Sequence, residues 1–263
     1  MERRITLSGG TGRAWRALAD VFLPRFCIFC GAAVPSSSAV DACPACSAGA
    51  ALPEGRYCPR CAAPTGEYAA KCPNCHNLSI RLDGATAFGF YDGTLRERVR
   101  QFKFHGAQHL ARTLGTLLAR AAAARWPEVR FEAAAGVPLH RRRKRERGFD
   151  QAAELARWSA RELGVPHARR LLKRRRFTES QVGLSRSARL RNVKGAFAAS
   201  VKSGLENVLL VDDTMTTGAT LSEAARTLKN AGVKHVYGAV AARAGFEAAP
   251  VRSEGSGKGE TPV

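Results

Sequence analysis

The sequence predicts an α/β fold in which helices cover both faces of a parallel sheet, with a small cysteine-rich module ahead of it. Three observations support this prediction. Residues 208–211 are Val-Leu-Leu-Val, an unbroken apolar run of the kind found in strands that are buried on both faces. Apolar side chains then recur at helical spacing over residues 219–228, as they do when a strand leads through a turn into a helix. All eight cysteines lie before residue 80, in four Cys-x-x-Cys pairs.

Length and composition narrow the class of protein. With 263 residues the chain has room for one sizeable domain and a small module. No run approaches the roughly eighteen apolar residues of a membrane span. Arg13 and Arg16 interrupt the amino-terminal region, which argues against a signal peptide. We therefore expect a cytoplasmic protein with reduced thiols.

The chain is strongly basic, with 42 Lys and Arg against 22 Asp and Glu and a formal net charge of +20. Residues 141–194 hold eighteen Lys or Arg and five Asp or Glu, so this segment carries +13 of that charge. Basicity of this size favours polyanionic partners, although it says nothing about the fold.

The cysteine pairs predict two structural zinc ions. A Cys-x-x-Cys turn aims two thiolates at one ion, and two such turns complete a tetrahedral site. The simplest assignment joins consecutive pairs, with Cys27, Cys30, Cys43 and Cys46 in one site and Cys58, Cys61, Cys72 and Cys75 in the other. A crossed assignment stays open. Disulfides are disfavoured by the expected compartment, and a dithiol redox site would not need four pairs.

After residue 80, apolar runs and helical spacing alternate along the chain. We expect a strand at 85–91, followed by helices at 94–104 and 110–124, the second of them rich in Leu and Ala. An apolar run over 131–139 is interpreted as the first strand of the parallel sheet. It leads into a basic segment at 141–148 that we expect to be a loop.

The second half continues this alternation. A helix with inward-facing Ala and Leu is expected at 150–163, and a second strand at 166–173. Residues 174–192 are basic with little apolar periodicity, and so long a loop in a compact domain is usually a functional lid or disordered. A short strand at 195–199 precedes the central strand and its helix, and 233–241 is the last buried strand.

The turn between the central strand and its helix has the chemistry of a sugar-phosphate site. A helix amino terminus offers unpaired N–H groups and a positive dipole end to a phosphate. The hydroxyls of the threonines add donors and the glycine permits close backbone approach; these residues are Thr214, Thr216, Thr217, Gly218 and Thr220. Asp212 and Asp213 would repel a phosphate but can accept hydrogen bonds from a vicinal diol. The alternative is an ordinary capped helix after a buried strand, with acids there by chance.

Residues 208–220 resemble the binding motif of type I phosphoribosyltransferases. In that family the paired acids hold the ribose hydroxyls of 5-phosphoribosyl 1-pyrophosphate (PRPP), and the loop holds its 5′-phosphate. The resemblance implies that Asp212 and Asp213 are both substrate-binding and catalytic. It also implies the fold of that family, a parallel sheet with helices on both faces and a hood.

The wider order of motifs resembles the ComF family, phosphoribosyltransferase-like proteins associated with natural transformation. The resemblance rests on the cysteine pairs, the PRPP motif, and on Phe102-Lys103-Phe104, Val137-Pro138-Leu139, Arg147-Gly148-Phe149-Asp150-Gln151, Thr178 with Gln181, and Arg191-Asn192-Val193. The family usually has Asn where this chain has Asp150, so an amide contact is not carried over. Asp is still a good helix N-cap.

By this resemblance the turn after Leu139 corresponds to the pyrophosphate loop of type I phosphoribosyltransferases. As pyrophosphate leaves, C1′ becomes oxocarbenium-like, so Mg²⁺ and basic groups must stabilise the departing charge. Arg141 and Arg147 are the catalytic candidates, with Arg142 and Lys103 binding PRPP. Each arginine could equally be a solvated surface charge. Residues 174–192 would be the mobile loop that closes over the transition state and excludes water.

Two functions stay open at this point. One is transfer of the phosphoribosyl group from PRPP and Mg²⁺ to a nitrogen nucleophile, ammonia or a nucleobase, with a role in DNA uptake. The other is a non-catalytic accessory that binds single-stranded DNA, with PRPP as a regulatory ligand and other competence proteins as partners. Aromatic side chains for base stacking are sparse near the basic clusters, where we count Phe149, Trp158 and Phe177.

The expected organisation has four parts. Residues 1–22 form a helical lead, for which a role at a membrane surface is the minor alternative. Residues 23–80 form a double zinc ribbon, in which metal supplies much of the folding energy because large apolar residues are few. Residues 81–246 form the phosphoribosyltransferase domain, and residues 247–263 are a disordered tail.

Overall fold

The computed structural model describes residues 22, 24–50, 52, 57–65, 72–76, 80–178, 185–201 and 204–245. The elements, in chain order, are β1 Arg25–Phe26, β2 Ala33–Val34, α2 Pro44–Ala50, α3 Pro73–His76, β3 Gly84–Phe90, α4 Gly93–Phe104, α5 Leu110–Arg125, β4 Ala133–Gly136, α6 Arg141–Arg147, α7 Gln151–Leu163, β5 Leu172–Arg174, α8 Arg186–Val193, β6 Phe197–Ala199, β7 Asn207–Met215, α9 Ala219–Asn230 and β8 His235–Arg243. The expected lead, apart from Phe22, and the expected tail lie outside the described residues. Within the described part of the chain, no helix combines the length and apolarity needed to cross a bilayer.

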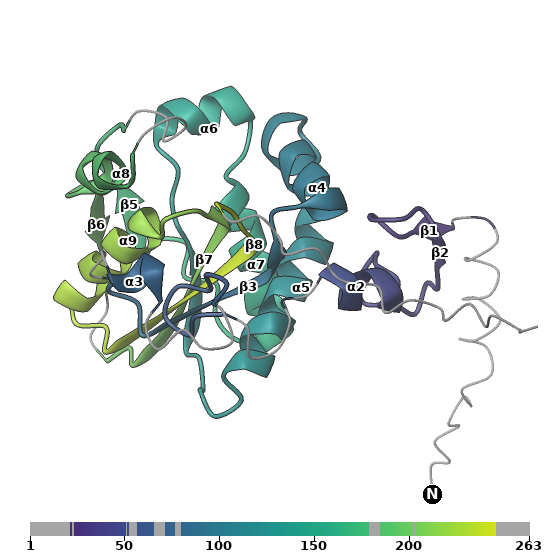
Figure 1. Ribbon diagram of the computed structural model, residues 1–263, viewed down its shortest axis with the longest axis horizontal. Coiled ribbons are helices and arrows are strands. Elements are labelled where there is room, and N and C mark those ends of the chain that lie inside the picture. The colour runs from purple at the N-terminus through teal and green to yellow at the C-terminus, as the bar shows by residue number, and fades with distance from the viewer. Residues whose placement is uncertain are drawn as a thin grey trace, which may run out of the picture.

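A four-stranded parallel sheet forms the centre of the molecule, in the order β3-β8-β7-β4 (Figure 1). The apolar run of β7 is fully buried, as expected for a central strand. Its alternate side chains enter two cores: Leu209 and Val211 pack with α4, α5 and α7, whereas Val208 and Leu210 pack with α9. Helices therefore cover both faces of the sheet, which confirms the predicted fold class.

The parallel sheet begins earlier in the chain than we expected. β3 pairs in parallel with β8, so β3 and not the segment 131–139 is its first strand, and β4 is shorter than that segment. The segment 166–173 is not a second central strand. It makes one bridge to β4 at His167, and β5 then pairs antiparallel with β6 in a separate two-stranded sheet. A central strand must be apolar on both faces, and Arg169, Arg170 and Lys173 within this segment do not allow this.

Two helices occupy segments that lack an apolar stripe. α6 lies where a loop was expected; it has no buried residue, so capping and local pairs stabilise it. The ring Nδ1 of His140 accepts from the backbone N–H of Arg142, Gly148 ends the helix in the left-handed conformation, and Arg142 pairs with Glu146. α8 lies inside the expected lid and begins at the N-cap Ser185.

The cysteine-rich region divides into two parts that pack on opposite faces of the sheet. In the first part, Phe29 joins the core of α5 and α7, and its ring lies 6.3 Å from that of Phe88 on β3. In the second part, residues 61–63 join the core of α9. The backbone N–H of Ala85 in β3 also donates to the carbonyl of Pro59, at 2.9 Å. In Figure 1, β1, β2 and α2 extend beyond α5 on one side, while α3 lies on the side of α9.

Candidate functional site

A cleft of about 790 Å³ opens at the carboxyl end of β7, where ligands bind in open α/β sheets. Its lining comes from β7, the turn into α9, α4, α6, β5 and α8, which are far apart in the sequence. Of the binding and catalytic candidates named from the sequence, those that line it are Lys103, Arg142, Arg147, Asp212, Asp213, Thr214, Thr216, Gly218 and Thr220. The fold thus gathers the acid pair, the loop and three basic residues around one space.

The acid pair lies within β7, because the strand continues to Met215 and does not end before the acids. Asp213 is paired with a cation from another element: its Oδ1 lies 3.0 Å from Nζ of Lys103 on α4. The same Nζ donates to the hydroxyl of Thr214 at 2.7 Å, and this hydroxyl donates to Asp213 at 3.0 Å. Arg147 lies 4.0 Å from the other oxygen of Asp213. Lys103 therefore fixes the position of Asp213 and offsets part of its charge.

Asp212 differs from its neighbour in its ionisation. The side chain is half-buried at the floor of the cleft. Desolvation by the surrounding protein, together with the charge of Asp213, raises the pKa of Asp212 to about 8. The N–H of Asp213, which donates to Asp212 Oδ1 at 2.8 Å, and the charges of Lys103 and Arg174 oppose this shift. A pKa of about 8 favours the protonated form of Asp212 near neutral pH.

The turn between β7 and α9 contributes Gly218 to the lining of the cleft. Gly218 adopts φ +83° at the N-cap of α9, and a Cβ there would lie 2.6 Å from Cε of Met215. Only glycine fits both constraints. Thr217 does not line the cleft: it is buried, and its hydroxyl accepts from the N–H of Ala219 at 3.3 Å. Thr217 thus helps to cap the helix, and the other residues of the turn face the cleft.

The basic wall of the cleft differs in part from the residues expected. Arg141 is exposed at the start of α6 and is not among the lining residues. Arg143 and Arg174, which were not proposed as site residues, do line the cleft, and both donate to Thr178. Burial lowers the pKa of both guanidinium groups. The charge of Arg147 lowers the pKa of Arg143 further, and the charge of Arg143 does the same to Arg174. These arginines repel one another, which favours an anion between them.

A third unexpected arginine comes from the predicted lid. Arg189 on α8 lines the cleft and donates to the hydroxyl of Thr216, at 2.7 Å. Thr216 belongs to the turn between β7 and α9, residues 216–218, which we call the phosphate-type turn after the motif in the sequence. The basic composition of this segment was a signal for such a contact. It could not indicate which arginine makes it, because the position of α8 over the turn depends on the tertiary structure.

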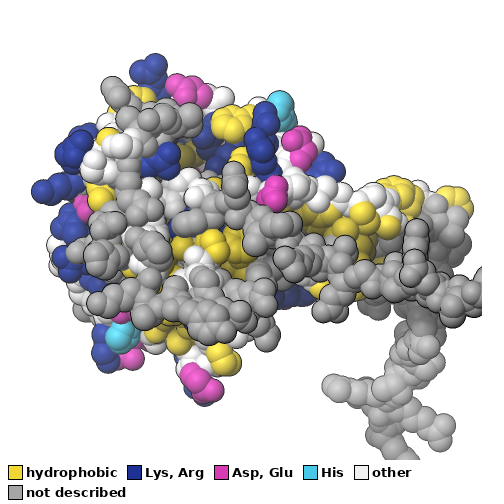
Figure 2. Space-filling view, viewed as in Figure 1, with side chains coloured by type: hydrophobic (Ala, Val, Ile, Leu, Met, Phe, Trp, Pro, Cys, Tyr) yellow, Lys and Arg dark blue, Asp and Glu magenta, His cyan; other side chains and the backbone are white. Residues whose placement is uncertain are grey.

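The mouth of the cleft carries exposed aromatic side chains beside arginines. Phe104 is 64% exposed and Phe177 is 38% exposed. Arg147 stacks over the ring of Phe104 and Arg142 over the ring of Phe177, each at 5.2 Å from the ring centre. Figure 2 shows basic side chains gathered over the part of the molecule where Figure 1 places α6 and α8.

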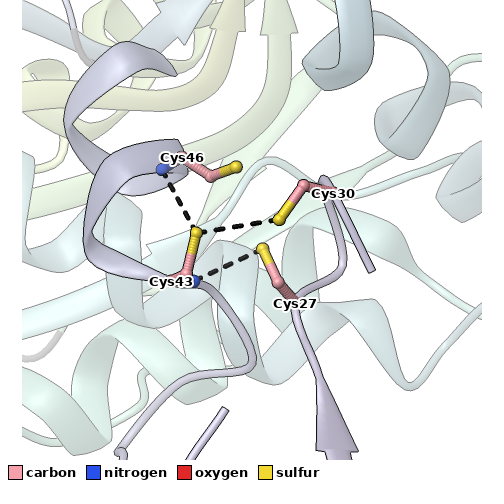
Figure 3. Close-up of side chains that lie close together, drawn as sticks. All are labelled: Cys27, Cys30, Cys43 and Cys46. Atoms are coloured by element: carbon pink, nitrogen blue, oxygen red, sulfur yellow. Dashed lines mark hydrogen bonds between the residues drawn. The ribbon is translucent and has the colours of Figure 1, made fainter. Parts of the chain in front are cut away.

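The cysteines form two clusters, and the pairing is sequential as expected. The ligand atoms of Cys27, Cys30, Cys43 and Cys46 lie within 4.8 Å of one another, as do those of Cys58, Cys61, Cys72 and Cys75. Figure 3 shows the first cluster, with side chains from two turns converging. Sulfur pairs within the clusters are 3.6 to 3.8 Å apart. Four thiolates at about 2.3 Å from a tetrahedral zinc would be separated by about 3.8 Å. Both clusters therefore fit a structural zinc ion.

Comparison with protein families matches two segments of the chain. Residues 18–76 match the double zinc ribbon domain and residues 150–254 match the phosphoribosyl transferase domain. Among solved structures, the glutamine PRPP amidotransferase from B. subtilis is similar at 21% identity and a TM-score of 0.37, over 53% of this chain and 30% of that chain.

Several relatives are similar over most of their length. Competence protein F of Haemophilus influenzae is 34% identical over 186 residues, which are 68% of this chain and 81% of that protein. The DNA utilization protein YhgH of Escherichia coli K12 is 28% identical over 74% of this chain and 86% of its own. Competence protein ComFC of Bacillus subtilis is 28% identical over 68% and 73%. Because this similarity spans most of both chains and two domain models account for its two parts, the chain belongs to the ComF family, in which a double zinc ribbon precedes a phosphoribosyltransferase domain.

Proposed function

We propose that the cleft binds PRPP with Mg²⁺ and that the protein transfers the phosphoribosyl group to a nitrogen nucleophile. This activity would have a role in DNA uptake. The observation that carries this proposal is the consecutive placement of an acid pair and a helix-capping turn in the lining of a cleft that six Lys and Arg side chains also line. A ribose ring can face the acids, a 5′-phosphate the turn, and a pyrophosphate the arginines. Each of these pairings follows ordinary charge and hydrogen-bond complementarity.

The residues have separable roles in this proposal. Asp213, held by Lys103, accepts hydrogen bonds from one ribose hydroxyl, and Asp212 accepts from the other once it has lost its proton. Arg147 and Arg142 line the cleft, and in this proposal they stabilise the leaving pyrophosphate. Carboxylate oxygens beside substrate phosphates are the donors that Mg²⁺ takes, so the acid pair fits an ion carried in with PRPP. When bound, that ion would neutralise charge on the departing group.

Calorimetric titration of PRPP and Mg²⁺ into the zinc-loaded protein tests the binding. We expect binding by the wild type and by Glu162→Gln, which alters an exposed acid paired with Arg120 outside the cleft lining. The variant Asp212→Asn/Asp213→Asn should lose it. Pyrophosphate release on addition of ammonia or nucleobases would then identify the acceptor. A wild type that binds no PRPP at millimolar concentration would contradict the proposal.

A second function, binding of single-stranded DNA, is favoured by the aromatic and basic mouth of the cleft and by the names of the relatives. Lys144 and Arg145 are exposed on α6 and do not line the cleft. We expect Lys144→Glu/Arg145→Glu to weaken oligonucleotide binding and to reduce its salt dependence, with PRPP binding kept as the control. Fluorescence anisotropy at several salt concentrations measures the affinity for the oligonucleotide and its salt dependence. An unchanged salt slope would exclude α6 as the DNA-binding surface.

A further inference from the structure

Arg243, the last residue of β8, lies between the second cysteine cluster and the phosphate-type turn. Its side chain is fully buried. On one side, Nε donates to the carbonyl of Cys61 at 2.9 Å. On the other side, Nη1 donates to the carbonyls of Met215, at 2.8 Å, and Thr216. One guanidinium thus bridges a residue of the cluster and the backbone that begins the turn.

This bridge is stiff because a buried charge depends on its hydrogen bonds. A guanidinium out of water is strongly unfavourable unless its donors are satisfied, and charge-assisted bonds to carbonyls offset that penalty. Its planar fork also fixes the directions in which the carbonyls must lie. A shift of the Cys61 carbonyl would therefore either displace the carbonyls of Met215 and Thr216 or weaken the bonds that hold the guanidinium.

The chain that follows the second cluster also contacts the turn and α9. Ala62, directly after Cys61, is buried with φ +52°, a left-handed conformation that a non-glycine residue adopts only when its surroundings hold it there. Ile80 packs against Gly218, since a Cβ on that glycine would lie 3.5 Å from Ile80 Cδ1. The N–H of Arg81 donates to the hydroxyl of Ser222 in the first turn of α9, at 2.9 Å. Residues 80–81, which follow the second cluster in the chain, thus lie against the turn and the start of α9.

The first cluster has no equivalent connection among the described residues. It packs on the opposite face of the sheet, and the N–H of Asp41 donates to Thr113 of α5 at 3.0 Å. α5 contributes no lining residue to the cleft. The chain therefore contains two chemically similar clusters of four cysteines, of which one touches the phosphate-type turn through Arg243 and the other does not.

We propose that Arg243 is a positioning residue that couples metal occupancy of the second cysteine cluster to the geometry of the phosphate-type turn. Zinc in the second cluster, but not in the first, then sets the affinity of the cleft for the phosphate end of its ligand. The ligand named here, PRPP, rests on the function proposed above, whereas the coupling between cluster and turn does not.

Matched loss of one zinc from either cluster tests the coupling. Cys75→Ser and Cys30→Ser should each lower the bound zinc from two ions to one, as measured by metal analysis of the full chain. We expect Cys75→Ser to weaken binding of PRPP with Mg²⁺ by about tenfold or more and to speed hydrogen exchange in the peptide over 214–220. Cys30→Ser should change affinity by less than about twofold and leave that exchange unaltered. Equal effects of the two variants, or none, would overturn the proposal.

The exchange measurement separates this proposal from the proposed function. If the wild type binds no PRPP, the function fails, but faster exchange of the turn in Cys75→Ser alone still supports the coupling. If PRPP binds and the turn exchanges equally in both variants, the function stands and the coupling fails. Inorganic phosphate serves as a second probe of the turn in either case.

Arg243→Lys tests the bridge itself, because lysine keeps the charge and loses the fork. It should weaken PRPP binding by about tenfold while both zinc ions stay bound. In the double variant Arg243→Lys/Cys75→Ser, loss of zinc should add little further, since the path between the sites is already broken. Additive losses would contradict the role of Arg243. If Arg243→Lys does not fold, as judged by thermal melting, the matched cysteine variants decide the proposal alone.

Discussion

Replacement of Asp212 by Asn tests whether the ligand-free cleft destabilises the ionised form of Asp212. Burial and the neighbouring Asp213 raise the pKa of Asp212 from an ordinary 3.8 to about 8. Between these two values the unfolded chain has released the proton and the folded chain has not. The folded state then binds more protons, so the free energy of unfolding falls as the pH rises through this window. Asn at this position cannot ionise, and its contribution does not change with pH.

The expected size follows from the width of the window. One pKa unit corresponds to about 1.4 kcal/mol, and the fall in the free energy of unfolding flattens near pH 8. Between pH 6 and pH 8 the stability of Asp212→Asn relative to the wild type should therefore rise by at most about 2 kcal/mol. For a domain of this size, this is a relative rise in Tm of roughly 4 to 8 °C. The gain in stability should accompany the loss of PRPP binding, as is common where a functional site holds a group unfavourably.

Thermal melts of the two zinc-loaded proteins at pH 6, 7 and 8 measure the effect. Glu162→Gln is the control, because Glu162 is exposed and pairs with Arg120 on the surface. Its Tm difference from the wild type should stay nearly constant over this range. If the difference for Asp212→Asn were also constant, or became smaller as the pH rose, Asp212 would ionise normally and the reasoning would be refuted.

Two glycine substitutions give further predictions. Gly218→Ala would place a Cβ 2.6 Å from Cε of Met215 at φ +83°, so it should abolish PRPP binding. Gly232→Ala, at φ +102° with open space around it, should lower only the Tm. Calorimetry and thermal melting distinguish the two variants, and equal PRPP affinity in both would contradict the role of the turn. Gly136→Ala would place a Cβ 2.6 Å from the backbone of Ala152 and so force α7 away from β4; we expect a loss of about 1 to 3 kcal/mol in chemical denaturation, and an unchanged midpoint would show that the helix can shift freely.

The two cysteine clusters suggest why the small module and the larger domain belong to one chain. Each part of the module contributes apolar side chains to a different core of the domain, on opposite faces of the sheet. The module is therefore not an appendage on a linker, and its metal ions stabilise packing on both sides. This arrangement fits the small number of large apolar residues between the cysteines, because the domain supplies further apolar surface for the module to pack against.

Features with a local cause could be predicted from the sequence. The run 208–211 is apolar at every position because each face of β7 meets a core, and α4, α5, α7 and α9 show the apolar stripes by which they pack. Asp150 caps α7 by accepting from the N–H of Ala153, which needs only neighbouring residues. Cys-x-x-Cys spacing likewise fixes the pairs by local turn geometry. The roles of the acid pair and the basic residues in catalysis stay predictions.

Other features depended on the tertiary structure. α6 has no buried residue, so no apolar periodicity could reveal it. The segment 166–173, expected as a central strand, leads instead into β5 of a separate two-stranded sheet, because its basic residues cannot be buried in the central sheet. Arg243 is the sharpest case. Its acceptors include the backbone carbonyls of Met215 and Cys61, which are 28 and 182 residues away in the sequence, so sequence spacing does not reveal this contact. Every residue carries such a carbonyl, and only the folded chain decides which of them converge on one guanidinium.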